Sequence, residues 1–212
     1  FDLDGTVSDP KAGITGSVQY ALHALGIEEP DLDRLEPFIG PPLRDSFQEY
    51  YNLNEEQTEF AVKKYRERFC AKGIYENILY PGMKELLNRL KESGCHLAVA
   101  SSKLEVSVTE ILRYFAIGDC FEVTVGSEPD GRRSKKEEVV DEALHRFFTD
   151  GKIPFDDIVM VGDRKFDIVG GKEYGLHQIG VTYGYAPEGE LEEAGAEYLA
   201  HSVEELGRIL LG

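Results

Sequence analysis

Apolar and polar residues follow two different patterns along this chain of 212 residues. Between residues 13 and 78 the apolar positions recur three and four residues apart, which is the spacing of amphipathic helices, and no strand-like alternation is present. From residue 82 onward, short continuous apolar runs alternate with segments of helical spacing. Such runs are typical of strands buried on both faces of a parallel sheet. The pattern therefore predicts an α/β protein, a Rossmann-like parallel sheet with helices on both faces and an inserted helical domain.

The two patterns also give the expected elements. The predicted helices lie at residues 13–25, 45–51, 55–72, 83–93, 104–116, 135–148, 164–174, 188–194 and 203–211. The predicted strands lie at 97–100, 122–126, 158–161, 178–183 and 197–200, after a first strand that ends at residues 2–4. We expect connections without regular structure at 7–12, 28–34 and 38–43. These limits predict a core domain of residues 1–12 and 79–212 and a helical cap domain of residues 13–78.

The first six residues, Phe-Asp-Leu-Asp-Gly-Thr, place two carboxylates at alternate positions before a glycine. Alternate side chains of a strand point the same way, so Asp2 and Asp4 should converge just past a strand end. Carboxylates this close repel each other, and both stay ionised only beside a cation. Magnesium binds one or two carboxylates together with water and phosphate oxygens. We therefore predict a magnesium site here, with an ordinary acidic turn as the alternative. Since a buried strand usually runs about 5–6 residues, we also expect residues to be missing before Phe1.

Polar residues also follow two of the other predicted strands. Ser101 and Ser102 end one apolar run, and Asp163 ends another. The carboxyl ends of parallel strands meet at one edge of the sheet, where the sites of such folds lie. Three polar strand ends from distant parts of the chain are therefore expected at one place. The helical insertion begins directly after the first of them, so we expect it to act as a lid.

This set of residues is suited to phosphoryl transfer. Asp2 can attack phosphorus and form an aspartyl phosphate. Asp4 can give a proton to the leaving oxygen and later take one from water. Ser101 can donate a hydrogen bond to the phosphoryl group, and a lysine can supply positive charge. We predict Asp163 as a metal ligand, with Asp167 as a second carboxylate. Taken singly, the serine could instead cap the next helix, and Asp167 could be a surface charge.

The order of these motifs resembles that of the haloacid dehalogenase-like hydrolases. The resemblance is specifically to the phosphatases that carry a helical cap after the first motif. The resemblance extends over essentially the whole chain. The first motif is the stretch from Asp2 to Asp9, the second is Ser101, and the fourth is the stretch from Val161 to Asp167.

The resemblance implies a magnesium cofactor and an aspartyl-phosphate intermediate. It implies the Asp2 carboxylate and the Asp4 main-chain carbonyl as metal ligands, next to Asp163 and Asp167. We further predict substrate contacts from residues in or beside these motifs, namely Gly5, Thr6 and Ser102.

The third motif departs from the commonest family pattern. Many relatives carry Lys-Pro, whereas this chain has Ser134-Lys135-Lys136-Glu137. A Lys-Ala-Glu-Val pattern of some members favours Lys136 as the phosphate-binding lysine, and Lys135 remains an alternative. Taken alone, either lysine would be read as a solvated side chain.

Several reactions share these motifs. A dehalogenase would be expected to lack the second aspartate, Asp4. A phosphonate hydrolase would need a cap lysine that forms a Schiff base, for which Lys11 is a candidate. A phosphomutase or a pyrophosphatase would use the same motifs, and a binding protein on this fold would predict a damaged acidic site. We predict a magnesium-dependent phosphomonoester hydrolase acting on a small phosphorylated metabolite.

Substrate choice is expected to depend on the cap. The segment from Phe38 to Arg44 resembles the cap loop of phosphoglycolate phosphatases and cytosolic nucleotidase-like members, and Val181–Tyr185 resembles the latter. Arg44 could bind a carboxylate or a second phosphate, or could be a surface arginine. The expected substrates are of the phosphoglycolate or nucleoside monophosphate class.

The composition limits which binding partners and which cellular compartment we expect. The net charge of −17, without a basic stretch, argues against nucleic acid. No apolar run approaches the roughly 18 residues of a membrane span. The three separated cysteines favour a reducing cytoplasm over a disulfide framework. We expect a cytoplasmic monomer or homodimer whose partner is a small phosphate ester.

Overall fold

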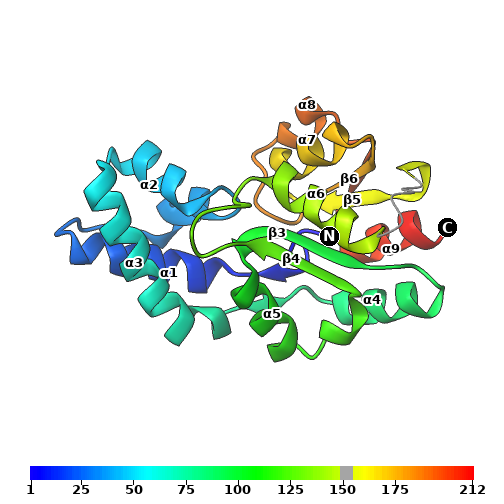
Figure 1. Ribbon diagram of the computed structural model, residues 1–212, viewed down its shortest axis with the longest axis horizontal. Helices are drawn as coiled ribbons and strands as arrows, with labels where there is room; N and C mark the ends of the chain where they lie inside the picture. Colours follow the sequence, from blue (N-terminus) through cyan, green and yellow to red (C-terminus); the bar gives the residue numbers. More distant parts are fainter. Residues whose placement is uncertain (149–154) are drawn as a thin grey trace. The chain divides into compact units, whose positions relative to one another are not determined.

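The computed structural model describes residues 1–148 and 155–212, and these form two compact units (Figure 1). The core unit consists of Phe1–Asp9 and Leu79–Gly212. The helical unit consists of Pro10–Ile78. None of the helices in the described residues combines the length and the apolar character needed to cross a bilayer.

Parallel strands form the centre of the core unit. β3 (Ala98–Leu104) pairs with β4 (Val123–Ser127), and β5 (Val159–Gly162) pairs with β6 (His177–Val181), which pairs with β7 (Tyr198–Ala200). All of these pairings are parallel, so the predicted α/β class is confirmed.

The first two residues join the β3–β4 and β5–β7 sheets. The nitrogen of Phe1 donates to the carbonyl of Ala98 at 2.9 Å, and the N–H of Ala100 donates to the carbonyl of Phe1 at 2.9 Å. On the other side, the N–H of Asp2 donates to the carbonyl of Val161 at 2.9 Å. Phe1 and Asp2 thus occupy a strand position between β3 and β5. A first strand was predicted at these residues, without a position in the sheet.

Helices cover both faces of these strands (Figure 1). α6 (Lys136–Phe147) packs on β3 and β4, α7 (Lys165–Glu173) packs on β5 and β6, and the two helices contact each other. α4 (Met83–Glu92) and α9 (Val203–Leu211) pack together, and α5 (Glu105–Tyr114) packs on β3 and β4. The short α8 (Glu190–Ala194) contacts α7.

An apolar cluster fixes α6 against the sheet. It combines one stripe of α6 with residues of three strands and of the loop before β6: Ala100, Val125, Val139, Val140, Ala143, Leu144, Met160 and Leu176. Because this stripe holds the helix, the first turn of α6, which contains Lys136, has a fixed position beside the end of β3.

The helical unit is built from three helices and two short 3-10 helices: α1 (Lys11–Ala24), η1 (Leu32–Phe38), α2 (Leu43–Tyr51), α3 (Glu55–Ala71) and η2 (Gly73–Tyr75). Asn54 and Gln57 form a reciprocal capping box that begins α3. The two-residue strands β1 (Ser8–Asp9) and β2 (Ile78–Leu79) lie where the chain passes between the units.

The predicted limits of helices and strands are within two residues of the observed ones, with one exception. β3 was predicted to end at residue 100, but it continues to Leu104 through a register shift, after which Leu104 pairs with Ser127. Two predicted connections were wrong. Residues 32–34 of the predicted connection 28–34 belong to η1, whose start is capped by the Asp31 side chain accepting from Asp33 N–H. Residues 7–12 contain β1 and the first two residues of α1, which begins directly after Pro10.

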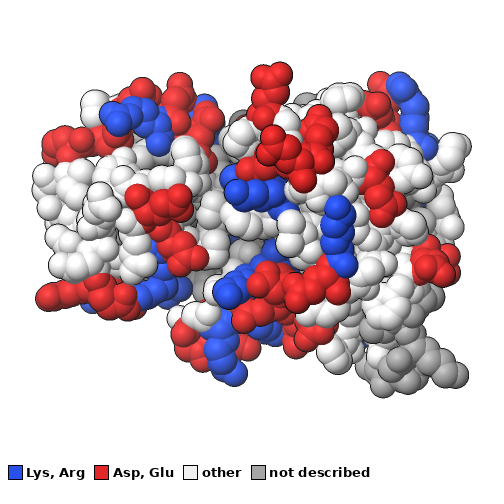
Figure 2. Space-filling model, turned by 90° about the horizontal axis from the view of Figure 1, so that it is seen from above, with Lys and Arg blue, Asp and Glu red and all other residues white. Residues whose placement is uncertain are grey.

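The two units carry an excess of acidic residues without a large basic area on the visible face. In Figure 2, Lys and Arg side chains of the described residues lie scattered among Asp and Glu.

The α6 cluster predicts a stability difference between two truncations. Leu144→Ala removes a buried side chain, so we expect the free energy of unfolding of the core unit to fall by about 2–5 kcal/mol. The matched change Val169→Ala, on the exposed side of α7 and 55% exposed, should cost much less. Urea denaturation followed by circular dichroism measures both. Equal losses in the two variants would contradict the assigned core.

Candidate active site

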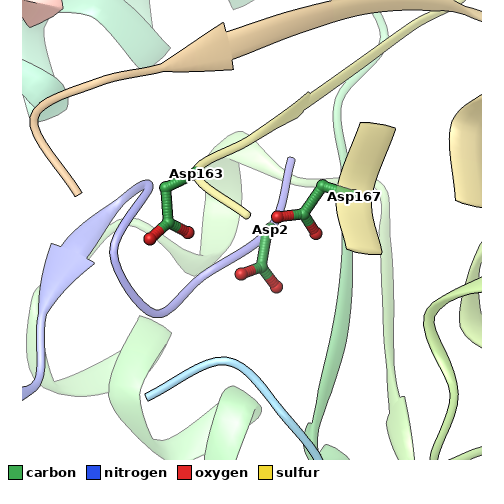
Figure 3. Close-up of side chains that lie close together, drawn as sticks. All are labelled: Asp2, Asp163 and Asp167. Atoms are coloured by element: carbon green, nitrogen blue, oxygen red, sulfur yellow. The ribbon is translucent and has the colours of Figure 1, made fainter. Parts of the chain in front are cut away.

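Three buried carboxylates converge at the carboxyl edge of the sheet (Figure 3). Asp2 lies in the N-terminal segment, Asp163 follows β5 directly, and Asp167 lies in the first turn of α7. Each offers an oxygen within 4.8 Å of the others. Residues separated by about 160 positions in the chain therefore share one small acidic region.

Asp163 is held from two sides. The hydroxyl of Thr6 donates to its Oδ1 at 3.2 Å, and the N–H of Tyr185 donates to its Oδ2 at 2.8 Å. Gly5 has a φ of +83°, and a Cβ there would lie 2.1 Å from Oδ2 of Asp163. Only glycine fits this approach. The structure thus places Gly5 and Thr6 against Asp163.

Asp167 is fixed by the start of its own helix. Its Oδ2 accepts the N–H of Arg164 at 2.9 Å as part of a helix-start hydrogen-bond pattern. A Cβ on Gly162 would lie 2.4 Å from the same oxygen, so the glycine that ends β5 leaves room for this carboxylate.

Lys136 joins two of the carboxylates. Its Nζ lies 2.7 Å from Oδ1 of Asp2 and 2.7 Å from Oδ1 of Asp167, and it also donates to the carbonyl of Ala100 at 3.0 Å. Burial opposes its charged form, but Asp167 and Asp2 outweigh burial and raise the pKa of Lys136. Lys135, in contrast, is exposed at the start of α6. The structure brings Lys136, the lysine favoured by the motif, into the acidic region.

Asp4 lies beside a second lysine that sequence reasoning did not select. Nζ of Lys103 lies 2.6 Å from Oδ2 of Asp4, and both side chains are about nine-tenths buried. Oδ1 of Asp4 has no hydrogen-bond partner among the described residues. Burial raises the pKa of Asp4, and Lys103 partly offsets that rise. A signal was present in the sequence, because Lys103 is two positions after Ser101 in the same apolar-to-polar strand end.

The charges in this region do not balance. Four buried carboxylates face two ammonium groups: Asp2, Asp4, Asp163 and Asp167 against Lys103 and Lys136. Burial and the charges of Asp167 and Asp2 raise the pKa of Asp163 well above its usual range. The neighbouring Arg164 is paired with Glu190 at 2.8 Å. With all four ionised, the region would carry two uncompensated negative charges on oxygen ligands, a set that suits a hard divalent cation.

Ser101 is buried at the point where β3 approaches this region. It follows Ala100, whose backbone bonds to Phe1 and Lys136. Its hydroxyl oxygen accepts the N–H of Lys103 at 3.4 Å, and Ser102 is half-buried. Neither serine caps the following helix, because α5 begins after Leu104 without a side-chain cap. The capping explanation of these serines is therefore wrong.

Two other candidates lie in the helical unit and are bound by carboxylates there. Arg44 pairs with Glu55 and Glu59. Lys11 pairs with Asp33 at 2.8 Å and with Glu36. Hydrogen bonds to these two carboxylates raise the pKa of Lys11, whereas Schiff-base formation needs a neutral amine.

Comparison with known proteins identifies the family of this chain. The family model described as haloacid dehalogenase-like hydrolase matches residues 1–181. The chain is 47% identical over 191 residues to a 5'-nucleotidase of Pseudomonas aeruginosa, covering 90% of this chain and 85% of that protein. It is 35% identical over 202 residues to the tyrosine-protein kinase PtkA of Mycobacterium tuberculosis, covering 95% of this chain and 67% of that protein.

Structural likeness extends over the full chain. The crystal structure of a predicted phosphatase from Clostridium acetobutylicum superposes with a TM-score of 0.94 at 45% identity, covering 100% of this chain and 96% of that one. A phosphoglycolate phosphatase of Agrobacterium fabrum is 31% identical over 207 residues, covering 91% of this chain and 84% of that protein. The chain therefore belongs to the haloacid dehalogenase-like hydrolase family, and it is an enzyme of the phosphatase kind within that family.

Proposed function

We propose that this protein is a magnesium-dependent phosphomonoester hydrolase that works through an aspartyl phosphate on Asp2. One observation carries the proposal: the Asp2 carboxylate is buried between the ammonium of Lys136 and the carboxylates of Asp163 and Asp167. The Lys136 ammonium contacts one oxygen of this buried carboxylate, and a carboxylate held in this way can act as a nucleophile toward phosphorus.

The acidic region fits a magnesium ion. Asp2, Asp163 and Asp167 would hold the cation, with the main-chain carbonyl of Asp4 as a further ligand expected from the family. All of these are oxygen donors, and the two excess negative charges match one divalent ion. When bound, the cation would neutralise charge on the phosphoryl oxygens and on the attacking carboxylate.

Each of the other residues then has its own role in the proposed reaction. A carboxylate oxygen of Asp2 attacks phosphorus, while Lys136 stabilises the negative charge that develops beside it. Asp4 gives its proton to the leaving oxygen and later takes one from the water that hydrolyses the aspartyl phosphate. Ser101, with Ser102 beside it, donates a hydrogen bond to the phosphoryl group. In this scheme Gly5 and Thr6 also contact the phosphoryl group from the loop after Asp4.

The substrate proposed is a small phosphate monoester, with a nucleoside monophosphate first and phosphoglycolate second. The order follows the relatives: the one named 5'-nucleotidase is more similar to this chain than the one named phosphoglycolate phosphatase. We propose that the helical unit is the cap that selects the substrate. Arg44 remains a candidate there, and an anionic substrate would have to replace its pairing with Glu55 and Glu59.

The three cysteines support a cytoplasmic location. Cys70, Cys95 and Cys120 are all free thiols, and free thiols are typical of proteins in reducing compartments.

A metal-dependent screen tests the substrate class. Purified protein is assayed with magnesium against nucleoside monophosphates, phosphoglycolate, sugar phosphates, pyrophosphate and phosphotyrosine, the last because of the PtkA relative. We expect the highest kcat/KM among the nucleoside monophosphates. A clear preference for pyrophosphate, or turnover of none of these compounds, would contradict the proposed substrate class.

Asp2→Asn tests the nucleophile. A neutral amide cannot form the phosphoenzyme, so we expect kcat on p-nitrophenyl phosphate to fall by at least about 10³-fold with an unchanged circular dichroism spectrum. The matched change Asp119→Asn, at an exposed carboxylate outside the region, should keep full activity. Acid quenching during turnover should trap phosphate on Asp2, detectable by mass spectrometry. Wild-type turnover by Asp2→Asn would remove the nucleophile assignment.

Asp163→Asn tests the metal site without relying on activity. Because a cation that binds only the native state stabilises it, added magnesium should raise the melting temperature of the wild type by roughly 2–8 °C. Asp163→Asn removes one ligand charge, so the increase should disappear in that variant and persist in Asp119→Asn. Chelator treatment should abolish the increase in the wild type. An equal increase in Asp163→Asn would place the cation elsewhere.

A further inference from the structure

The pair formed by Asp4 and Lys103 has no part in the proposed scheme beyond the role of Asp4. Lys103 lies near the end of β3, three residues after the strand position paired with Phe1, and its Nζ lies 2.6 Å from Oδ2 of Asp4. Both side chains are about nine-tenths buried. A buried ion pair of this kind holds its partner in one orientation, because leaving either charge alone would be costly.

The pair distinguishes the two oxygens of Asp4. A lysine ammonium has three donor hydrogens and no acceptor, so the oxygen that faces it can only accept. Oδ2 faces Lys103, while Oδ1 is buried with no hydrogen-bond partner in the part of the chain that the structure describes. Oδ1 is therefore the oxygen of Asp4 that remains for an interaction with another group.

We propose that Lys103 is a positioning residue: by binding Oδ2 it fixes the Asp4 carboxyl group, so that Oδ1 is the oxygen that exchanges a proton with the substrate. This inference rests on the proposed function, in which Asp4 is the proton donor. Lys103 itself does not touch the reacting atoms in this account. It acts through Oδ2 of Asp4.

The proton balance of both half-reactions follows from this arrangement. In the first, the bond from Asp2 to phosphorus forms and the bond from phosphorus to the ester oxygen breaks. The proton of Oδ1 moves to that oxygen, so the leaving group departs as a neutral alcohol and Asp4 becomes a carboxylate paired with Lys103. In the second, water attacks phosphorus, Oδ1 takes the water proton, and inorganic phosphate and free Asp2 are released.

Varying the basicity of the leaving group tests this inference, because loss of a merely structural lysine would lower kcat on all substrates alike. Nitrophenyl, chlorophenyl and phenyl phosphates release oxygens of increasing basicity, so the need for a proton donor rises along the series. Removing the donor with Asp4→Asn should cost about 10²–10⁴-fold in kcat on phenyl phosphate and much less on nitrophenyl phosphate. Lys103→Met should show the same trend, with a loss of about tenfold or more on phenyl phosphate. Lys103→Arg, which keeps a cationic donor, should recover part of the loss.

A double variant shows whether Lys103 acts only through Asp4. If it does, adding Lys103→Met to Asp4→Asn should change kcat no further on any substrate of the series. The control is Lys91→Met, which removes another lysine whose ammonium donates a hydrogen bond, in that case to the carbonyl of Asp119 at an exposed position. This control should leave the whole series unchanged. Lys103→Gln replaces the Met variant if the melting temperature shows that Lys103→Met is unfolded.

The outcomes that contradict this inference differ from those that contradict the proposed function. Suppose that Asp4→Asn steepens the dependence of kcat on the leaving group, but Lys103→Met and Lys103→Gln lower kcat equally on all substrates. The inference then fails and the proposed function stands. A rise in KM alone, or a further loss in the double variant, also overturns it, since Lys103 would then contact the substrate directly. If Asp4→Asn itself leaves the dependence unchanged, the role of Asp4 fails and this inference fails with it.

Discussion

Mutual repulsion of buried carboxylates is the constraint on which the site of this protein depends. Asp2, Asp163 and Asp167 are buried, and their carboxylate oxygens lie within 4.8 Å of one another. Burial and the neighbouring carboxylates raise the pKa of Asp163 and of Asp167. Lys136 offsets part of the repulsion by contacting two of them. What remains is an acidic cluster of oxygen ligands, the kind of site that we propose for a divalent cation.

The fold produces this arrangement by bringing the ends of separate strands and helices to one edge of the sheet. Phe1 and Asp2 are held in the sheet by backbone hydrogen bonds to both neighbouring strands, so the proposed nucleophile is on a rigid element. The buried stripe of α6 fixes Lys136, and β5 leads directly to Asp163. Each charged group is thus positioned by packing that lies outside the site. This explains how like charges can stay so close without the backbone moving to separate them.

Much of this could be predicted from the sequence, because it follows from local periodicity. The helix and strand order was correct, and Asp2 and Asp163 were expected at the ends of two strands. The burial of Lys136 also had a local signal, since it lies four and seven residues before the buried Val140 and Ala143 on one face of a helix. Lys103, the extension of β3 and η1 were missed. Each depends on a partner distant in the sequence or on a single side-chain cap, and periodicity reports neither.

The location of the cation is the most direct measure of the central claim. Crystals grown with Mn²⁺, which resembles magnesium in its preference for oxygen ligands, can be measured at the manganese absorption edge. The account predicts one strong anomalous peak in contact with carboxylate oxygens of Asp2 and Asp163. A fully occupied peak bound elsewhere, or none in this acidic region at saturating Mn²⁺, would contradict it.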